Sequence, residues 1–102
     1  MTLVDQIRKA RVRYMTEEYD GHGEVSGFLE FNHRDYAQFR SEVDFDRLSL
    51  GTGGEIDKFE GIELLSVKDI PCSKVEFMFS NNQYPYRYAL ATAKHYVLES
   101  EL

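Results

Sequence analysis

Histidine and aspartate are among the residues of this chain that could bind a metal ion. The three histidines, His22, His33 and His95, are far apart, and no HxH or HxxxH spacing places two imidazoles on one element. A zinc site would therefore need ligands drawn from separate elements. Asp44 and Asp46 are close enough to share a cation, but two carboxylates alone bind a metal weakly. We expect no metal centre and no cofactor.

The acidic stretch 15–24, which ends in Gly21-His22-Gly23, has the acid content of a calcium-binding loop. It lacks the alternating Asp and Asn ligands and the glutamate at the twelfth position that such a loop needs. A solvated turn is the better interpretation. Its acids are Glu17, Glu18, Asp20 and Glu24.

The glycine-rich run Gly51-Thr52-Gly53-Gly54 could cradle a phosphate, because bare backbone amides bind anions. No Gly-Lys-Ser/Thr follows it, and no helix is expected to begin directly after it. Glu55 and Asp57 would add repulsive charge beside a bound phosphate. We interpret the run as a surface loop, with a nucleotide-handling enzyme as the less favoured alternative.

Covalent chemistry has little support in the sequence. Cys72 is the single cysteine, so no internal disulfide can form, and its place after Pro71 suggests a partly exposed thiol in a reducing compartment. No nucleophile elbow or similar local context supports a serine–histidine–acid triad. We therefore expect that the protein is not an enzyme.

Length and composition indicate one domain over residues 1–102, with 42% hydrophobic and 29% charged residues. The net charge of −6 argues against a nucleic-acid binder that neutralises phosphates. The first residues do not resemble a signal peptide, and no apolar run is long enough to span a membrane. We expect a soluble, intracellular protein. The one basic cluster, expected to be solvated or paired with an acidic partner or with acidic turns of the same fold, is Arg8, Lys9, Arg11 and Arg13.

Hydrophobic spacing predicts the elements that would position these groups. Residues 2–14 read as a helix capped by Thr2, and residues 25–31 alternate as a strand whose Gly27 leaves room for a bulky neighbour such as a helix-borne aromatic. Asn32 then caps a short second helix. In that helix Arg34, Gln38 and Glu42 are expected to face water, and the residues expected on the sheet are Tyr36, Phe39 and Val43.

Residues 59–79 hold the pattern on which the predicted fold depends. Strands at 62–67 and 75–79 flank a polar link with Pro71, which predicts a hairpin with a loop of about five or six residues. Leu65 breaks the alternation of the first strand, so a bulge is expected there. The last segment, 86–99, favours a helix, although strand parity is also present.

These elements predict an α+β fold in the order α-β-α-β-β-α. We expect a small antiparallel sheet of about three or four strands, packed against two or three helices on one face. The strand order cannot be read from the sequence. Phe28 and Met78 have the opposite parity from the core and would lie on the other sheet face, where a partner or second copy could dock. Tyr84, Tyr86 and Tyr88 are further interface candidates, because tyrosine combines apolar area with a polar tip.

Part of this pattern resembles a family. The sequence over 25–79 is similar to a segment of small uncharacterised tailed-bacteriophage proteins, and a related hairpin occurs within phage major capsid proteins. Where such families commonly have glycine after the proline, this chain has Cys72-Ser73. The matching stretches are Phe31-Asn32-His33-Arg34-Asp35-Tyr36-x-x-Phe39, Phe59-x-Gly61-Ile62-Glu63-Leu64, Asp69-Ile70-Pro71 and Lys74-Val75-x-Phe77.

The resemblance implies a phage origin and carries no catalytic residue across. Together with the missing site chemistry, it favours a non-enzymatic phage protein that acts through protein–protein contacts, with a virion structural component as one version. The alternative is a small acidic phage inhibitor of a host defence or nucleic-acid-processing enzyme. Either reading implies a protein partner from the virion or the host, with a homo-oligomer also open. It implies a place in the virion or host cytoplasm, without membrane or direct nucleic-acid binding.

Overall fold

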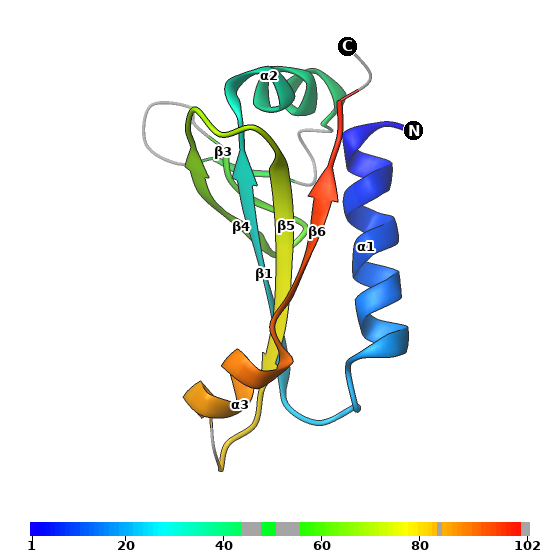
Figure 1. Cartoon of the computed structure of the whole chain (residues 1–102), viewed down its shortest axis with the longest axis vertical. Helices are drawn as coiled ribbons and strands as arrows, with labels where there is room; N and C mark the ends of the chain where they lie inside the picture. The colour runs from blue at the N-terminus through cyan, green and yellow to red at the C-terminus, as the bar shows by residue number, and fades with distance from the viewer. Residues whose placement is uncertain (44–47, 51–55, 84, 101–102) are drawn as a thin grey trace.

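The computed structural model describes residues 1–43, 48–50, 56–83 and 85–100 (Figure 1). The first half of this part holds α1 (Leu3–Glu17), β1 (Glu24–Phe31), α2 (His33–Glu42) and β2 (Leu48–Leu50). The second half holds β3 (Ile56–Phe59), β4 (Ile62–Val67), β5 (Ser73–Ser80), α3 (Pro85–Thr92) and β6 (Lys94–Leu98). No helix within these residues is long and apolar enough to cross a membrane.

The strands form one mixed sheet in the order β2-β3-β4-β1-β5-β6. β1 runs parallel to β4, whereas each other neighbouring pair is antiparallel. The α+β class is therefore confirmed, but the expected antiparallel sheet of three or four strands and the order α-β-α-β-β-α are wrong. The described part of the chain has six strands, and one helix lies between β5 and β6.

The predicted hairpin is also wrong, because β1 lies between its two strands. Gly27 of β1 is in register with Ile62 of β4 on one side and with Phe77 of β5 on the other. A Cβ atom on Gly27 would lie 2.9 Å from Phe77 Cε1 and 3.0 Å from Ile62 Cγ1. The missing side chain thus makes room for two bulky neighbours, both from strands rather than from the expected helix. The centre of the sheet is built around this glycine.

The expected irregularity at Leu65 is confirmed. The register between β1 and β4 shifts after Leu29, whose partner is Leu64, so that Glu30 pairs with Ser66. Leu65 is the extra residue of the bulge, and its side chain is 53% exposed.

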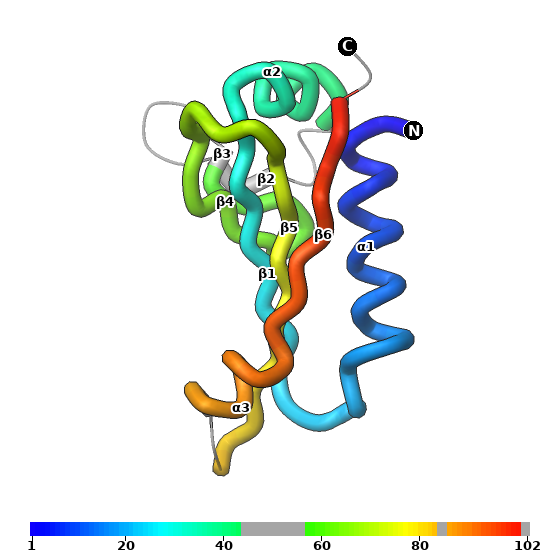
Figure 2. Tube along the Cα trace, viewed as in Figure 1, coloured from blue at the N-terminus to red at the C-terminus, as the bar shows by residue number. Residues whose placement is uncertain are grey.

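Two helices cover one face of the sheet, which we call the inner face (Figures 1 and 2). Tyr14 of α1 stacks on Phe77 with ring centroids 5.6 Å apart, and Phe39 of α2 packs between Phe31 and Phe59 at 4.9 and 5.3 Å. Both predicted caps are confirmed. The side chains of Thr2 and Asn32 accept hydrogen bonds from the backbone N–H groups of the two first-turn aspartates, at 3.1 and 2.8 Å.

One detail of the helices differs from expectation, and another decides between alternatives that the sequence left open. Gln38 is buried rather than facing water, because its amide donates a 2.6 Å hydrogen bond to the half-buried carboxylate of Glu42. On α1, the basic cluster pairs with an acidic turn of the same fold, which was one of the alternatives. Arg8 donates to the Glu60 carboxylate at 2.9 Å, and Arg11 donates to the Glu60 carbonyl at 3.0 Å.

The segment 86–99 is both helix and strand, so the prediction of one helix is wrong. Thr92, at the end of α3, explains the break. Its hydroxyl accepts from the N–H of Phe79 at 3.0 Å and donates to the Phe79 carbonyl at 2.9 Å. The hydroxyl therefore occupies the edge of β5 at Phe79, and β6 begins two residues later and continues the pairing with β5.

Candidate functional site

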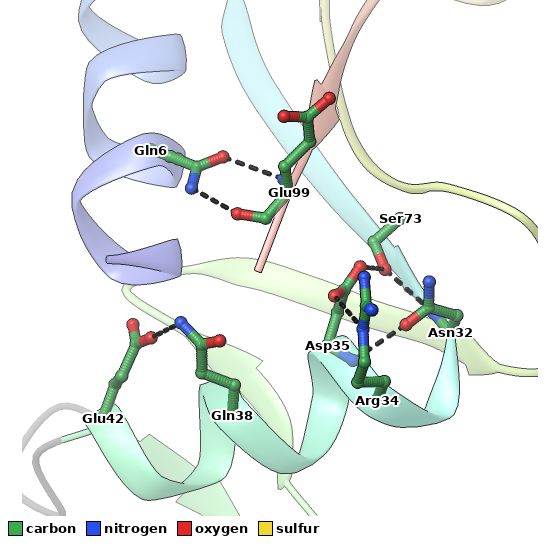
Figure 3. A network of polar contacts seen from close by, with 8 residues as sticks. All are labelled: Gln6, Asn32, Arg34, Asp35, Gln38, Glu42, Ser73 and Glu99. Carbon is green, nitrogen blue, oxygen red and sulfur yellow. Dashed lines mark hydrogen bonds and ion pairs between the residues drawn. The ribbon is translucent and has the colours of Figure 1, made fainter. Parts of the chain in front are cut away.

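A buried polar network joins β5 to the start of α2 (Figure 3). The Ser73 hydroxyl is fully buried, donates to Asp35 Oδ2 at 2.6 Å and accepts from the Asn32 N–H at 2.9 Å. A serine beside a carboxylate invites a catalytic interpretation. However, Ser73 has 0% and Asp35 2% exposure, so no substrate can reach them. The network is an internal anchor.

Of the other polar contacts in Figure 3, Gln6–Glu99 joins two segments of the fold, whereas Gln38–Glu42 lies within α2. Glu42 accepts from the amide of Gln38 and from the backbone N–H of Val4, at 2.6 and 2.9 Å, which links α2 to the start of α1. The Gln6 amide donates to the Glu99 carbonyl at 2.7 Å and accepts from the Glu99 N–H at 3.0 Å. These contacts position helices, and none brings together groups that would make or break a bond.

Among the described residues, the histidines and acids do not gather into a site. His22, His33 and His95 are all exposed, and within the residues that the structure describes no three His, Cys, Asp or Glu side chains could hold a metal ion. The hypothetical ligands Asp44 and Asp46 and the glycine run 51–54 lie outside the described residues. Three acids of the turn 17–24 bind their own chain, in the pairs Glu17–Arg13 at 3.2 Å, Glu18–Lys94 at 2.7 Å and Asp20–Tyr88 at 2.5 Å.

Tyr88 was an interface candidate, but its side chain is used within the domain. Its ring meets Phe79 edge-on with centroids 5.1 Å apart, and its hydroxyl donates to Asp20. That hydrogen bond lowers the pKa of the Asp20 carboxyl below 3.8 and raises the pKa of the Tyr88 phenol above 10.0. Of the neighbouring tyrosines, Tyr86 is 75% exposed on α3, and Tyr84 lies outside the described residues.

Phe28 and Met78 lie together on the sheet face opposite the core, which we call the outer face. Met78 is paired with the residue two before Phe28 in β1, so the two side chains are diagonal neighbours. Both are half-buried. The strand parity that singled them out therefore placed them correctly.

A shallow hollow of about 50 Å³ lies on this outer face. Its lining comes entirely from strands β1, β4 and β5: Phe28, Glu30, Leu65, Lys74 and Glu76. Leu65 was not among the predicted interface residues. The signal that could have identified it was the parity break, because a bulged residue on a strand is free to turn its side chain outward.

The charged residues around the hollow are neighbours of opposite sign. Glu30 lies between the ammonium groups of Lys68 and Lys74, at 3.8 and 3.5 Å. On the β3–β4 side, Lys58 is directly opposite Glu63, and cross-strand neighbours of opposite charge attract. The outer face thus combines an apolar centre with a charged rim, the arrangement of a protein contact surface.

Neither a family model nor a curated protein nor a solved structure matches this chain.

Proposed function

We propose that this protein acts through protein–protein contacts, without enzymatic chemistry, and that the outer face is its contact surface. One observation carries the proposal: Phe28 and Leu65 line a hollow at the middle of a sheet face and are surrounded by charges of both signs. Aromatic and aliphatic side chains at the centre of such a surface supply most of the binding free energy, and the charged rim supplies orientation.

A second copy of the chain is the partner that the charges favour. The protein carries a net charge of −6, so two copies repel each other over most of their surfaces. On the outer face, lysines at 58, 68 and 74 are matched by glutamates at 30, 63 and 76. Two such faces can meet with opposite charges paired, which removes the repulsion where the copies touch.

The resemblance to small tailed-phage proteins supports a virion component as the setting for this self-association. A structural protein needs a repeatable contact between copies and no reactive site. Mass spectrometry of purified virions tests this part of the proposal separately. If the virions hold none of this chain, the virion assignment is dropped, and the contact surface is judged by the experiment below.

The alternative of an acidic inhibitor receives less support. A decoy for a basic groove needs a surface of uncompensated acids. In this fold many acids are paired with cations of the same chain. The ion pairs, each within 4 Å, are Glu17–Arg13, Glu18–Lys94, Glu30 with both Lys68 and Lys74, and Glu60–Arg8.

Sedimentation velocity over a concentration series up to about 1 mM tests self-association through the outer face. We expect the wild type to form a dimer reversibly. Phe28→Ser should weaken that dimer by about tenfold or more, because it removes the central aromatic side chain. Tyr86→Ser is the matched control, since it removes an exposed aromatic from α3 and should leave the dimer unchanged.

A wild type that stays monomeric throughout the series would rule out the second copy as partner. A dimer that survives Phe28→Ser but not Tyr86→Ser would move the contact surface to α3. Circular dichroism of both variants ensures that a loss of association is not a loss of fold.

A further inference from the structure

A second surface of different character lies between α1 and the edge strand β6. β6 is the last strand of the sheet, so one side of its backbone has no neighbouring strand in the described part of the chain. At the end of β6, the Gln6 side chain makes both hydrogen bonds with Glu99 that a neighbouring strand would make (Figure 3). Within the described part of the chain, no side chain of α1 makes such hydrogen bonds with the β6 residues before Glu99.

Two independent contacts show which β6 residues turn their backbone N–H and C=O groups away from β5. Glu99 turns its N–H and C=O toward Gln6, away from β5, and backbone directions alternate along a strand. The backbone groups of Val97 and His95 must then also turn away from β5. On β5, Phe79 turns its backbone groups toward the β6 side, where Thr92 meets them. By the same alternation, the backbone groups of Val75 and Ser73 turn toward β6, where these residues pair with Tyr96 and Leu98. The backbone groups of Val97 and His95 therefore face away from β5.

A groove of about 190 Å³ runs beside this edge. Such a volume is below the roughly 300–1,000 Å³ of small-molecule pockets, but it suits one or two side chains of a peptide. Val97, at the edge of the groove, is 57% exposed. The lining residues come from the start of the chain, one flank of α1, and β6: Met1, Gln6, Lys9, Ala10, Arg13, Tyr96 and Val97.

The charges beside the edge select the occupant. Lys9 and Arg13 line the groove, and Lys94 begins β6. Arg13 and Lys94 are balanced by Glu17 and Glu18, whereas Lys9 forms no ion pair within the part of the chain that the structure describes. A second copy paired edge to edge would bring a second Lys9 to the same edge, and this like charge disfavours it. An extended segment with acidic side chains would instead place its carboxylates beside Lys9.

We propose that β6 binds an extended acidic segment of a partner protein, which adds to the sheet as a further strand beside α1. The backbone groups of Val97 and His95 supply the hydrogen bonds, and the groove takes side chains of one parity. This inference does not rest on the outer face, because the two surfaces share none of the residues that line their hollows.

Fluorescence anisotropy with a labelled peptide of about eight residues, the length of an ordinary strand, tests the proposal. The probe alternates Val and Glu, and its control alternates Val and Lys. Val97→Pro removes an N–H that points away from β5, so the sheet keeps its own bonds while the added strand loses one. We expect binding about tenfold weaker than in the wild type. Val97→Thr, which keeps the N–H, should bind as the wild type does.

Lys9→Glu tests the charge preference and should weaken binding of the Glu peptide by about threefold. Equal binding of the Lys and Glu peptides would overturn the preference for acids. No binding by the wild type, or unchanged binding by a folded Val97→Pro, would overturn strand addition. Should Val97→Pro fail to fold, a Glu peptide with N-methylated backbone replaces it, and binding as tight as that of the unmethylated peptide would reject the proposal.

Discussion

The hydroxyl of Ser73 donates a 2.6 Å hydrogen bond to the carboxylate of Asp35 in the interior of the protein. The two residues belong to β5 and to the first turn of α2, which are far apart in sequence. Through the Asn32 N–H, which donates to the same hydroxyl, the contact also holds the cap of α2. One serine thus fixes where the second helix sits on the sheet.

Ser73→Ala should destabilise the fold by about 1–3 kcal/mol, because it leaves a buried carboxylate oxygen and a backbone N–H without their partner. Chemical denaturation measures the change. Ser41→Ala is the control, since the exposed Ser41 bonds only the nearby Gln38 carbonyl in the described contacts, and it should stay within about 0.5 kcal/mol. An equal effect of the two substitutions would mean that the buried network contributes no more than a surface hydroxyl.

Gly27→Ala should cost about 1–3 kcal/mol, because the added methyl group enters the space that Phe77 and Ile62 fill. Ser26→Ala, at the exposed neighbouring position of β1, is the matched control and should change little. Thermal unfolding of both variants gives the comparison. An unchanged melting temperature for Gly27→Ala would show that β1 does not need a glycine between its two neighbours.

Tyr96→Phe should leave stability unchanged or raise it by up to about 1 kcal/mol. The Tyr96 hydroxyl is buried with no hydrogen-bond partner in the described part of the chain, so removing it removes a desolvation cost. Tyr14→Phe is the contrast, because the Tyr14 hydroxyl donates to the Thr92 carbonyl at 2.9 Å, and its loss should cost about 1 kcal/mol. A loss of stability in Tyr96→Phe comparable to that in Tyr14→Phe would contradict the assignment.

Tyr96→Phe should also change how the stability of the fold depends on alkaline pH. Burial raises the pKa of Tyr96 above 10.0, so the neutral phenol is favoured in the folded state. The contribution of this pKa difference to the free energy of unfolding is complete below pH 10 and is lost as the pH rises through the folded pKa. Tyr96→Phe should therefore lose less stability above pH 10 than the wild type does, as measured by melting temperature over an alkaline series.

The contact between Tyr88 and Asp20 should hold α3 in place only within a pH window. The hydrogen bond lowers the pKa of Asp20, so its stabilising effect is complete above 3.8 and is lost as the pH falls through the lower folded value. It also raises the pKa of Tyr88, so the effect is lost again as the pH rises through a value above 10.0. The protection factors of the α3 amides, which correct for the pH dependence of intrinsic exchange, should fall on both sides of this window. Tyr88→Phe should lower these protection factors within the window and weaken their pH dependence. Exchange rates that do not change with this substitution would exclude the contact as a determinant of α3.

Features that depend on neighbouring residues could be predicted from the sequence. Thr2 and Asn32 were recognised as caps because the side-chain oxygen meets a backbone N–H three residues later, and both hydrogen bonds are present. The faces of β1 followed from its period of two. Phe28 and Met78 were placed on the outer face by the same rule, and the bulge at Leu65 followed from the break in that period.

Features that depend on distant residues could not be predicted. The strands 62–67 and 75–79 look like a hairpin locally, and only the fit of Ile62 and Phe77 around Gly27 shows that β1 separates them. The end of α3 depends on Thr92 meeting Phe79, a tertiary contact that competes with helix propensity. The groove beside Val97 likewise exists only because α1 lies along β6, which no spacing within either element reveals.

The insertion of β1 between β4 and β5 has a kinetic consequence. Residues 62–80 cannot pair as a hairpin by themselves, although they are close in the chain. β1, which lies much earlier in the sequence, must first insert between β4 and β5. Closure of that long loop costs entropy before any ladder bond repays it. Refolding should therefore be slow for a domain of this size, and an isolated peptide covering residues 59–80 should remain a random coil.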